Sequence, residues 1–264
     1  MNTAVSPDGT KIAYDREGDG PAVILIDGAM CTRNAGAKPE LARLLAKHFT
    51  VFSYDRRGRG DSGDTSPYAV EREIEDIETL IDEGGGTASL FGHSSGAALA
   101  MEAALALGRK VTGLALYDAP FNDDPGARRA WQEYLGQLSS ALADGRNGDA
   151  VAAFMSYVGM PAGQISGMRQ APFWPGMEAI APTLAYDHTA ILGDGSVPAG
   201  RAARVGVPTL VLHGTAGFPF MAVTARTLAR AIPGAEGRAL EGQTHDIDAG
   251  VLAPVLTEFY GRAA

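Results

Sequence analysis

The residues best suited to chemistry lie at positions 92–96, where the sequence reads Gly-His-Ser-Ser-Gly. This stretch follows a β-type run at 87–91 and precedes a run of small residues at 97–107 that is typical of a helix. A Gly-x-Ser-x-Gly motif at a strand-to-helix turn is a nucleophile elbow, whose strained backbone lifts the serine hydroxyl above the sheet. Its glycines let the strand and the helix approach closely. Ser94 is therefore the candidate nucleophile; the alternative is that Ser94 or Ser95 only caps the helix.

The segments around this motif alternate between strand and helix patterns. Short apolar runs predict strands at residues 11–15, 22–26, 50–54, 87–91, 111–117, 208–213 and 238–240. Apolar residues at helical spacing predict helices near 41–45, 70–83, 97–107 and 221–231. This alternation predicts an α/β fold with a doubly wound, mostly parallel sheet and helices on both faces. Catalytic groups should gather at the carboxyl ends of the strands.

Residues 122–204 break the alternation with helical patterns and prolines. We expect a helical cap inserted into one α/β core, formed by residues 1–121 and 205–264, because no linker-like tract divides the chain. Most aromatic and methionine side chains of the cap should pack in its own core. A minority should form an apolar roof over the site. The candidates for this substrate pocket are Met30, Trp131, Phe154, Met155, Trp174 and Met177.

The composition is that of a soluble globular protein. Of the 264 residues, 45% are hydrophobic and 20% are charged, which allows a large core. The net charge of -9 argues against nucleic acid as a partner. Arg56, Arg57 and Arg59 are interrupted by glycines, and we interpret them as a solvated turn. No apolar run is long enough to span a membrane and the first ten residues do not resemble a signal peptide, so we expect a cytoplasmic protein without a membrane partner.

Cofactor-binding patterns are not found in the sequence. It has no Gly-rich phosphate loop, no dinucleotide-binding glycine pattern and no Cys/His spacing for a metal site, so we expect neither a cofactor nor a metal. The single cysteine, Cys31, excludes an internal disulfide, and we interpret it as a packed thiol rather than a reactive one. The sequence does not indicate an oligomeric state.

The order of these parts resembles the α/β-hydrolase fold over nearly the whole chain. Besides the elbow, the resemblance rests on Asp27-Gly28, where many members have His-Gly, on the arginine-rich turn at 55–62, and on Gly-Gln-Thr-His at 242–245. The Asp-Gly turn, the Ser-Ser-Gly-Ala elbow and an acid after the sixth strand are also similar to the fungal lactone hydrolases that open zearalenone. The resemblance is specific for the fold and does not carry that substrate over.

The resemblance implies that His245 is the general base. His245 follows the last predicted strand in a Gly-containing loop, the place from which this family delivers an imidazole to the serine. Four other histidines fit that place less well: His48, His93, His188 and His213.

The sequence departs from the commonest family pattern in the position of the carboxylate that would orient the histidine. Many relatives have an aspartate in the loop after the strand here at 208–213, but residues 214–220 contain no carboxylate. Some branches, including the haloalkane dehalogenases, place the acid after the preceding strand, where this chain has Asp118. We therefore expect Asp118 to orient His245. The other carboxylates considered for this role are Asp27, Asp246 and Asp248.

The resemblance then implies a serine hydrolase that cleaves a small-molecule carboxylic ester or lactone through an acyl-enzyme on Ser94. The oxyanion hole would use the backbone N–H of Ser95 and a second N–H from Gly28 or Ala29. Alternatives with the same triad are a thioesterase, a C–C bond hydrolase and a cofactor-free perhydrolase. A further alternative is a non-catalytic ligand-binding protein on this fold.

Overall fold

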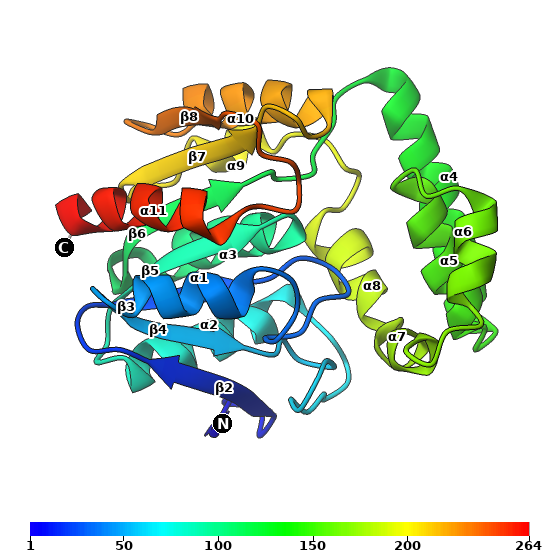
Figure 1. Cartoon of the computed structure of the whole chain (residues 1–264), viewed down its shortest axis with the longest axis horizontal. Coiled ribbons are helices and arrows are strands. Elements are labelled where there is room, and N and C mark those ends of the chain that lie inside the picture. Colours follow the sequence, from blue (N-terminus) through cyan, green and yellow to red (C-terminus); the bar gives the residue numbers. More distant parts are fainter. Residues whose placement is uncertain (264) are drawn as a thin grey trace.

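The computed structural model describes residues 1–263 and contains one eight-stranded sheet (Figure 1). The strands are β1 (Asn2–Val5), β2 (Lys11–Glu17), β3 (Ala22–Ile26), β4 (Thr50–Tyr54), β5 (Ala88–His93), β6 (Val111–Tyr117), β7 (Thr209–Gly214) and β8 (Glu236–Leu240). Their order in the sheet is β1-β2-β4-β3-β5-β6-β7-β8. Strand β2 runs antiparallel to both of its neighbours, and the pairs from β4 to β8 are parallel. The expected mostly parallel sheet is therefore confirmed.

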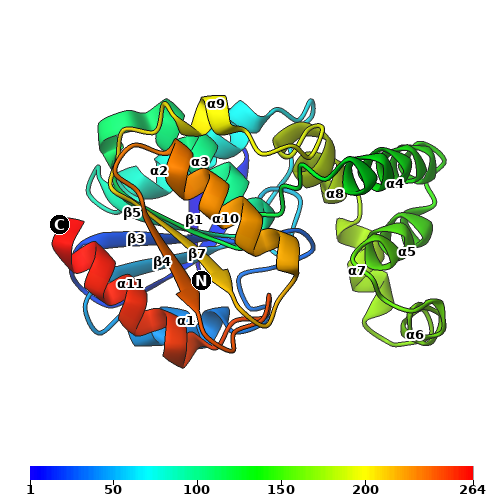
Figure 2. The same cartoon turned by 90° about the horizontal axis from the view of Figure 1, so that it is seen from above.

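Helices cover both faces of the sheet, as Figure 2 shows. They are α1 (Lys38–Leu45), α2 (Val70–Glu83), α3 (Ser95–Leu107), the short η1 (Gly108–Lys110), α10 (Pro219–Ala231) and α11 (Ala249–Ala263). Successive residues of β3 alternate between the two faces because side chains of a strand point in opposite directions. Val23 and Leu25 pack with residues of α1 and α11, whereas Ile24 and Ile26 pack with residues of α2 and α3. The doubly wound arrangement is thus confirmed.

The segment between β6 and β7 forms a helical insertion. It contains α4 (Pro125–Ala143), α5 (Asn147–Tyr157), α6 (Ala162–Met168), α7 (Trp174–Ile180), α8 (Thr183–Ala185), the π-helical turn η2 (Tyr186–Ile191) and α9 (Ala199–Ala202). Helix α4 begins where the sequence favours it, because the Asp124 side chain accepts a hydrogen bond from the Ala127 N–H at 2.9 Å and Pro125 occupies the first turn. Helices α4 to α6 lie farthest from the sheet (Figures 1 and 2).

Several predicted boundaries agree with the structure to the residue, namely those of β3, β4, β6 and α2. Two elements were not predicted. Strand β1 is a short edge strand whose residues are mostly exposed, and α11 contains Pro254 and is apolar on most sides, so neither gives a clear periodic pattern. Within residues 1–263, no helix is both long and apolar enough to cross a membrane.

Candidate active site

The elbow places Ser94 at the point where β5 turns into α3. Ser94 has φ 57° and ψ −127°, a strained conformation for a residue with a side chain. The flanking glycines meet a steric requirement. A Cβ on Gly92 would lie 2.4 Å from the carbonyl oxygen of Gly96, and a Cβ on Gly96 would lie 2.3 Å from that of Ile26. Only glycine fits at either position, so the strand and the helix can hold the serine above the sheet.

The structure brings His245 and Asp118 together across 127 residues of sequence. Nδ1 of His245 lies 3.2 Å from Oδ2 of Asp118, and the carboxylate is fully buried. Oδ1 of Asp118 accepts a hydrogen bond from the backbone N–H of Gly214 at 3.2 Å. Both carboxylate oxygens therefore have a donor, and Asp118 can hold the imidazole in the tautomer that carries its proton on Nδ1.

Tyr117, the last residue of β6, connects the elbow to the loop of His245. Its carbonyl accepts the backbone N–H of Ser94 at 3.0 Å, and its hydroxyl donates to the carbonyl of Thr244. His93 makes a second connection, because its Nε2 donates to the carbonyl of His245 at 3.0 Å. The loop that carries His245 is thus hydrogen-bonded to the last residues of both β5 and β6. Within residues 1–263, however, no hydrogen bond joins the Ser94 hydroxyl to His245.

His93 is a site residue whose role the sequence did not indicate. Burial, together with the nearby His245, lowers the pKa of His93 to about 3, so the ring is neutral at physiological pH. A neutral ring with its proton on Nε2 matches the hydrogen bond to the His245 carbonyl. No signal in the motif could have distinguished this supporting histidine from any other residue at the variable position of the elbow.

Two of the other carboxylates considered as the acid, Asp27 and Asp248, have different partners. The side chain of Asp27 contacts the ammonium group of Lys38. Asp248 accepts the backbone N–H of Gly250 at 2.7 Å, at the start of α11. Among the described residues, the hydrogen-bonded carboxylate at the His245 ring is that of Asp118.

The turn after β3 lies directly against Ser94. A Cβ on Gly28 would lie 2.9 Å from Cβ of Ser94 and 3.4 Å from its hydroxyl oxygen. The backbone of Gly28 therefore lies against the serine, and the backbone N–H of Ser95, in the first turn of α3, has no partner within the helix. Met30 continues this turn with φ 61° and is half-buried.

The interpretation of Arg56, Arg57 and Arg59 as a solvated turn was wrong. At most 1% of each residue is exposed. Buried arginines require carboxylate partners. These partners lie outside the turn, so the residues of the turn alone do not indicate them. Arg56 pairs with Glu73 and Asp187, Arg57 with Asp76 and Asp8, and Arg59 with Asp187.

Two of these arginines reach the turn beside Ser94. Nη1 of Arg56 donates to the carbonyl of Asp27 at 3.0 Å, and Nη1 of Arg59 donates to the carbonyl of Gly28 at 2.7 Å. Burial raises the pKa of Asp187, but Arg56 and Arg59 outweigh it and bring that pKa to about 2. Asp187 is consequently ionised, and together with Glu73 it balances the charges of the two guanidinium groups.

The predicted roof residues fall into two groups. Trp131, Met155 and Trp174 are at most 5% exposed, whereas Phe154, Met177 and Met30 are half-buried. The indole N–H of Trp131 donates to the Gly193 carbonyl at 2.9 Å, and that of Trp174 donates to Glu178 at 2.8 Å. Both tryptophans are therefore satisfied inside the insertion, and contact with a substrate stays a prediction for all six residues.

Two further features bear on cofactors and reactive groups. Within residues 1–263, no three His, Cys, Asp or Glu side chains gather in a way that could hold a metal ion. The Cys31 thiol is half-buried, and burial raises its pKa, so it is mostly protonated at neutral pH.

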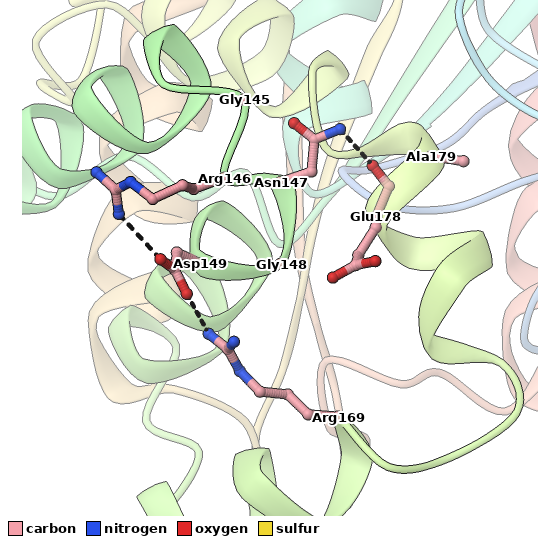
Figure 3. A pocket seen from close by; sticks show the side chains of 8 residues that line it. All are labelled: Gly145, Arg146, Asn147, Gly148, Asp149, Arg169, Glu178 and Ala179. Atoms are coloured by element: carbon pink, nitrogen blue, oxygen red, sulfur yellow. Dashed lines mark hydrogen bonds and ion pairs between the residues drawn. The ribbon is translucent and has the colours of Figure 1, made fainter.

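A surface pocket of about 460 Å³ lies in the insertion, away from the elbow (Figure 3). Its charged side chains are already paired. Asp149 binds Arg146 at 2.9 Å and Arg169 at 2.7 Å, and all three are exposed. This pocket therefore does not contribute to the candidate active site.

Comparisons with known proteins agree with this architecture. A family model described as the alpha/beta hydrolase family matches residues 34–255. The structure of an alpha/beta hydrolase from Sphaerobacter thermophilus DSM 20745 is 48% identical over 98% of this chain and 100% of that chain, with a TM-score of 0.85. The enol-lactonase from Burkholderia xenovorans LB400 shares the fold at 22% identity over 98% of this chain and 100% of that chain, with a TM-score of 0.72.

A curated relative, a putative carbamate hydrolase from Azorhizobium caulinodans, is 30% identical over 124 residues. The alignment covers 45% of each protein, so the chain spans less than half the length of this relative. The family model, in contrast, covers most of the chain, from residue 34 to residue 255. The chain belongs to the alpha/beta hydrolase family.

Proposed function

We propose that this protein is a serine hydrolase that cleaves a carboxylic ester or a lactone through an acyl-enzyme on Ser94. The observation that carries the proposal is the 3.2 Å contact between Nδ1 of His245 and the buried carboxylate of Asp118. This pair is attached to the elbow, because the carbonyl of His245 accepts a hydrogen bond from His93, next to Ser94 in the sequence.

The chemistry follows from the roles of the three groups. Asp118 accepts a hydrogen bond from the Nδ1–H of His245 and so leaves Nε2 as the base, which takes the hydroxyl proton of Ser94 as the serine oxygen attacks the carbonyl carbon. The imidazolium then gives its proton to the leaving alkoxide, and the acyl group stays on Ser94. His245 next removes a proton from water as the water oxygen attacks the ester carbonyl of the acyl-enzyme. The imidazolium then returns that proton to the Ser94 oxygen as the acyl–oxygen bond breaks and the acid leaves.

The oxyanion of each tetrahedral intermediate needs donors that are already in place. The backbone of Gly28 lies against Ser94 and Ser95 is the first residue of α3, which supports assigning the N–H of Ser95 and that of Gly28 or Ala29 to the oxyanion hole. Loss of one such donor costs about 3 kcal/mol in the barrier.

The preference for an ester or lactone rests on the serine nucleophile and on the expected roof. A serine forms acyl-enzymes with carbonyl substrates, whereas alkyl-enzyme chemistry in this family uses a carboxylate at the same position. The enol-lactonase with the same fold is compatible with a lactone substrate. Partly exposed apolar residues of the insertion, Phe154 and Met177, are candidates to contact its apolar portion.

The test is covalent labelling combined with a substrate panel. A fluorophosphonate should label Ser94, as identified by peptide mass spectrometry, and Ser94→Ala should abolish labelling and turnover. Ser156→Ala, which changes an exposed serine of α5, is the matched control and should leave both intact. p-Nitrophenyl esters, aromatic lactones and acyl-thioesters assayed side by side should rank esters or lactones first. Wild-type protein that is labelled elsewhere, or turnover that survives in Ser94→Ala, would overturn the proposal.

A further inference from the structure

The buried carboxylate of Asp187 connects the helical insertion to three residues of the core, Arg56, Arg59 and Ser95. Asp187 belongs to η2 and is 0% exposed. Its Oδ1 accepts hydrogen bonds from Nη1 of Arg56 at 2.6 Å and from the hydroxyl of Ser95 at 2.8 Å. Its Oδ2 accepts one from Nη2 of Arg59. Both oxygens are therefore occupied by donors from the core.

The same arginines determine how the turn after β3 is oriented. Arg56 binds the carbonyl of Asp27 and Arg59 binds the carbonyl of Gly28. The carbonyl of Asp27 shares a peptide plane with the N–H of Gly28, and the carbonyl of Gly28 shares one with the N–H of Ala29. Because a peptide group is planar and trans, fixing its carbonyl also fixes the direction of its N–H. Each arginine thus orients one of the two N–H groups considered for the oxyanion hole.

We propose that Asp187 is a positioning residue that sets the spacing between the two halves of the oxyanion hole. This inference rests on the proposed serine hydrolase function. One half is Ser95, which Asp187 holds through the hydroxyl, and the other is the turn at Gly28 and Ala29, which it holds through the two arginines. A single carboxylate from the insertion thereby keeps donors from two separate loops in one arrangement.

The charges explain why a carboxylate is required there. Arg56 has a second carboxylate partner, because Glu73 binds it through two hydrogen bonds of 2.7 and 2.6 Å. The hydrogen bonds of Arg59 go to Asp187 and to the carbonyl of Gly28, and its buried Nε has no partner among the described residues. Without the negative charge of Asp187, the guanidinium of Arg59 would be buried and uncompensated, and it would move toward solvent or another acceptor. The orientation of the Ala29 N–H would then be lost first.

Asp187→Asn is the main test because it keeps the size of the side chain and removes its charge. The matched control is Asp76→Asn. Asp76 is equally buried and holds Arg57 through two hydrogen bonds of 2.8 Å, but the other bonds of Arg57 go to Asp8 and to the carbonyl of Arg72, not to the turn. Both variants should therefore lose stability, and only Asp187→Asn should affect the oxyanion hole.

The readout must separate positioning from stability. At a temperature well below both melting transitions, Asp187→Asn should lower kcat roughly 10- to 100-fold with KM changed less than about threefold, since the donors act mainly in the transition state. Its affinity for an aryl boronic acid, which forms a tetrahedral adduct with the serine, should fall by a similar factor. Asp76→Asn should keep kcat and boronic acid affinity within about twofold of wild type.

Ser95→Ala is a milder second variant, in case Asp187→Asn does not fold. It removes one of the bonds to Asp187 and keeps the backbone N–H of residue 95. A parallel fall of kcat and boronic acid affinity by a factor of about three to ten would support the inference. Unchanged values in Ser95→Ala, or equal losses of kcat in Asp187→Asn and Asp76→Asn, would overturn it.

Failure of this inference is distinguishable from failure of the proposed function. If the fluorophosphonate does not label Ser94 in the wild-type protein, the serine hydrolase assignment fails and this inference fails with it. If labelling of Ser94 succeeds and Asp187→Asn turns over substrate at the wild-type rate, only the role of Asp187 is wrong.

Discussion

Two parts of the helical insertion are stabilised in different ways. The turn η2 is attached to the core by buried charges and by Tyr186, whose ring stacks on Tyr68 at 3.8 Å and whose hydroxyl donates to Asp64 at 2.6 Å. Helices α4 and α5 pack through Trp131 and Tyr134 of α4 against Tyr157 of α5, and α5 is also joined to the end of α6 by the exposed ion pair of Asp149 with Arg169. The two parts are continuous in sequence, yet their interactions differ in kind.

This difference predicts which substitutions in the insertion affect turnover and which do not. Breaking a buried ion pair leaves an uncompensated charge and is expensive, whereas an exposed ion pair contributes little. We expect substitutions in η2 and at the carboxyl edge of the sheet to change turnover. Substitutions in α4 to α7 should change stability or substrate preference and leave the reactivity of Ser94 intact.

The largest expected effect is on kcat and comes from a substitution at the carboxyl ends of the strands. Asp118→Asn should lower kcat by a factor of about 10⁴, because an asparagine cannot hold His245 in the tautomer that leaves Nε2 as the base. The measurement is kcat on the best ester of the panel, together with the rate of fluorophosphonate labelling. If Asp118→Asn loses less than about tenfold in kcat, and Asp27→Asn or Asp246→Asn shows the large loss instead, the acid must be reassigned.

The next effect concerns the packing of α4. Leu138 is 1% exposed, so Leu138→Ala should lower the free energy of unfolding by about 2–5 kcal/mol. The labelling rate of Ser94 should stay within about twofold of wild type while the variant is folded. Leu135→Ala, at a half-buried position of the same helix, is the control and should cost less. A large fall in the labelling rate of Leu138→Ala would show that α4 and the nucleophile are coupled.

His188 lies where the two parts of the insertion meet, and it should make stability depend on pH. Burial lowers its pKa from 6.5 to about 4, although Asp187 acts in the opposite direction. The unfolded chain therefore binds more protons than the folded chain between these two values. Its contribution to stability is complete above pH 6.5 and is lost as the pH falls toward 4, by up to about 1.4 kcal/mol per pH unit.

Urea unfolding of wild type and His188→Gln at pH 7, 6 and 5 measures this contribution. The variant should lose stability less steeply on acidification. Part of the slope should remain, since His93 also has a lowered pKa in the folded protein. An identical slope in both proteins would contradict the assignment of His188 as a neutral buried group.

The smallest effect is expected at the surface pocket of Figure 3. Asp149→Asn removes exposed ion pairs to Arg146 and Arg169, so the free energy of unfolding should fall by less than about 1 kcal/mol. Even this difference should shrink in 1 M salt, because exposed charges are screened. Turnover should be unchanged. A kcat loss of more than about threefold would mean that the distal insertion takes part in the reaction.

The sequence predicted the central part of the fold because its signals are local. The apolar runs of β3 and β6 and the periodic face of α2 give their boundaries, and the Gly-x-Ser-x-Gly motif locates the elbow. The candidate pair of His245 and Asp118 came from the order of parts in the resembling family, and the structure places the two side chains 3.2 Å apart. Their catalytic roles stay predictions.

The buried charges could not be predicted because their partners are distant in sequence. Arg56 and Arg59 resemble residues of an exposed turn until Asp187, more than a hundred positions away, is placed beside them. The role of His93 likewise depends on the carbonyl of His245. The roles of such buried polar residues follow from the contacts of their side chains in the structure and cannot be inferred from the residue type alone.

The last residue of β6 has a consequence for how the protein can change. Tyr117 holds the backbone of Ser94 with its carbonyl and the loop of His245 with its hydroxyl, and Asp118 follows it directly. Ser94, His245 and Asp118 are thus all attached to the end of β6. We expect a displacement of this strand end to move the three residues together, so that sequence changes in the surrounding helices leave their relative placement unchanged.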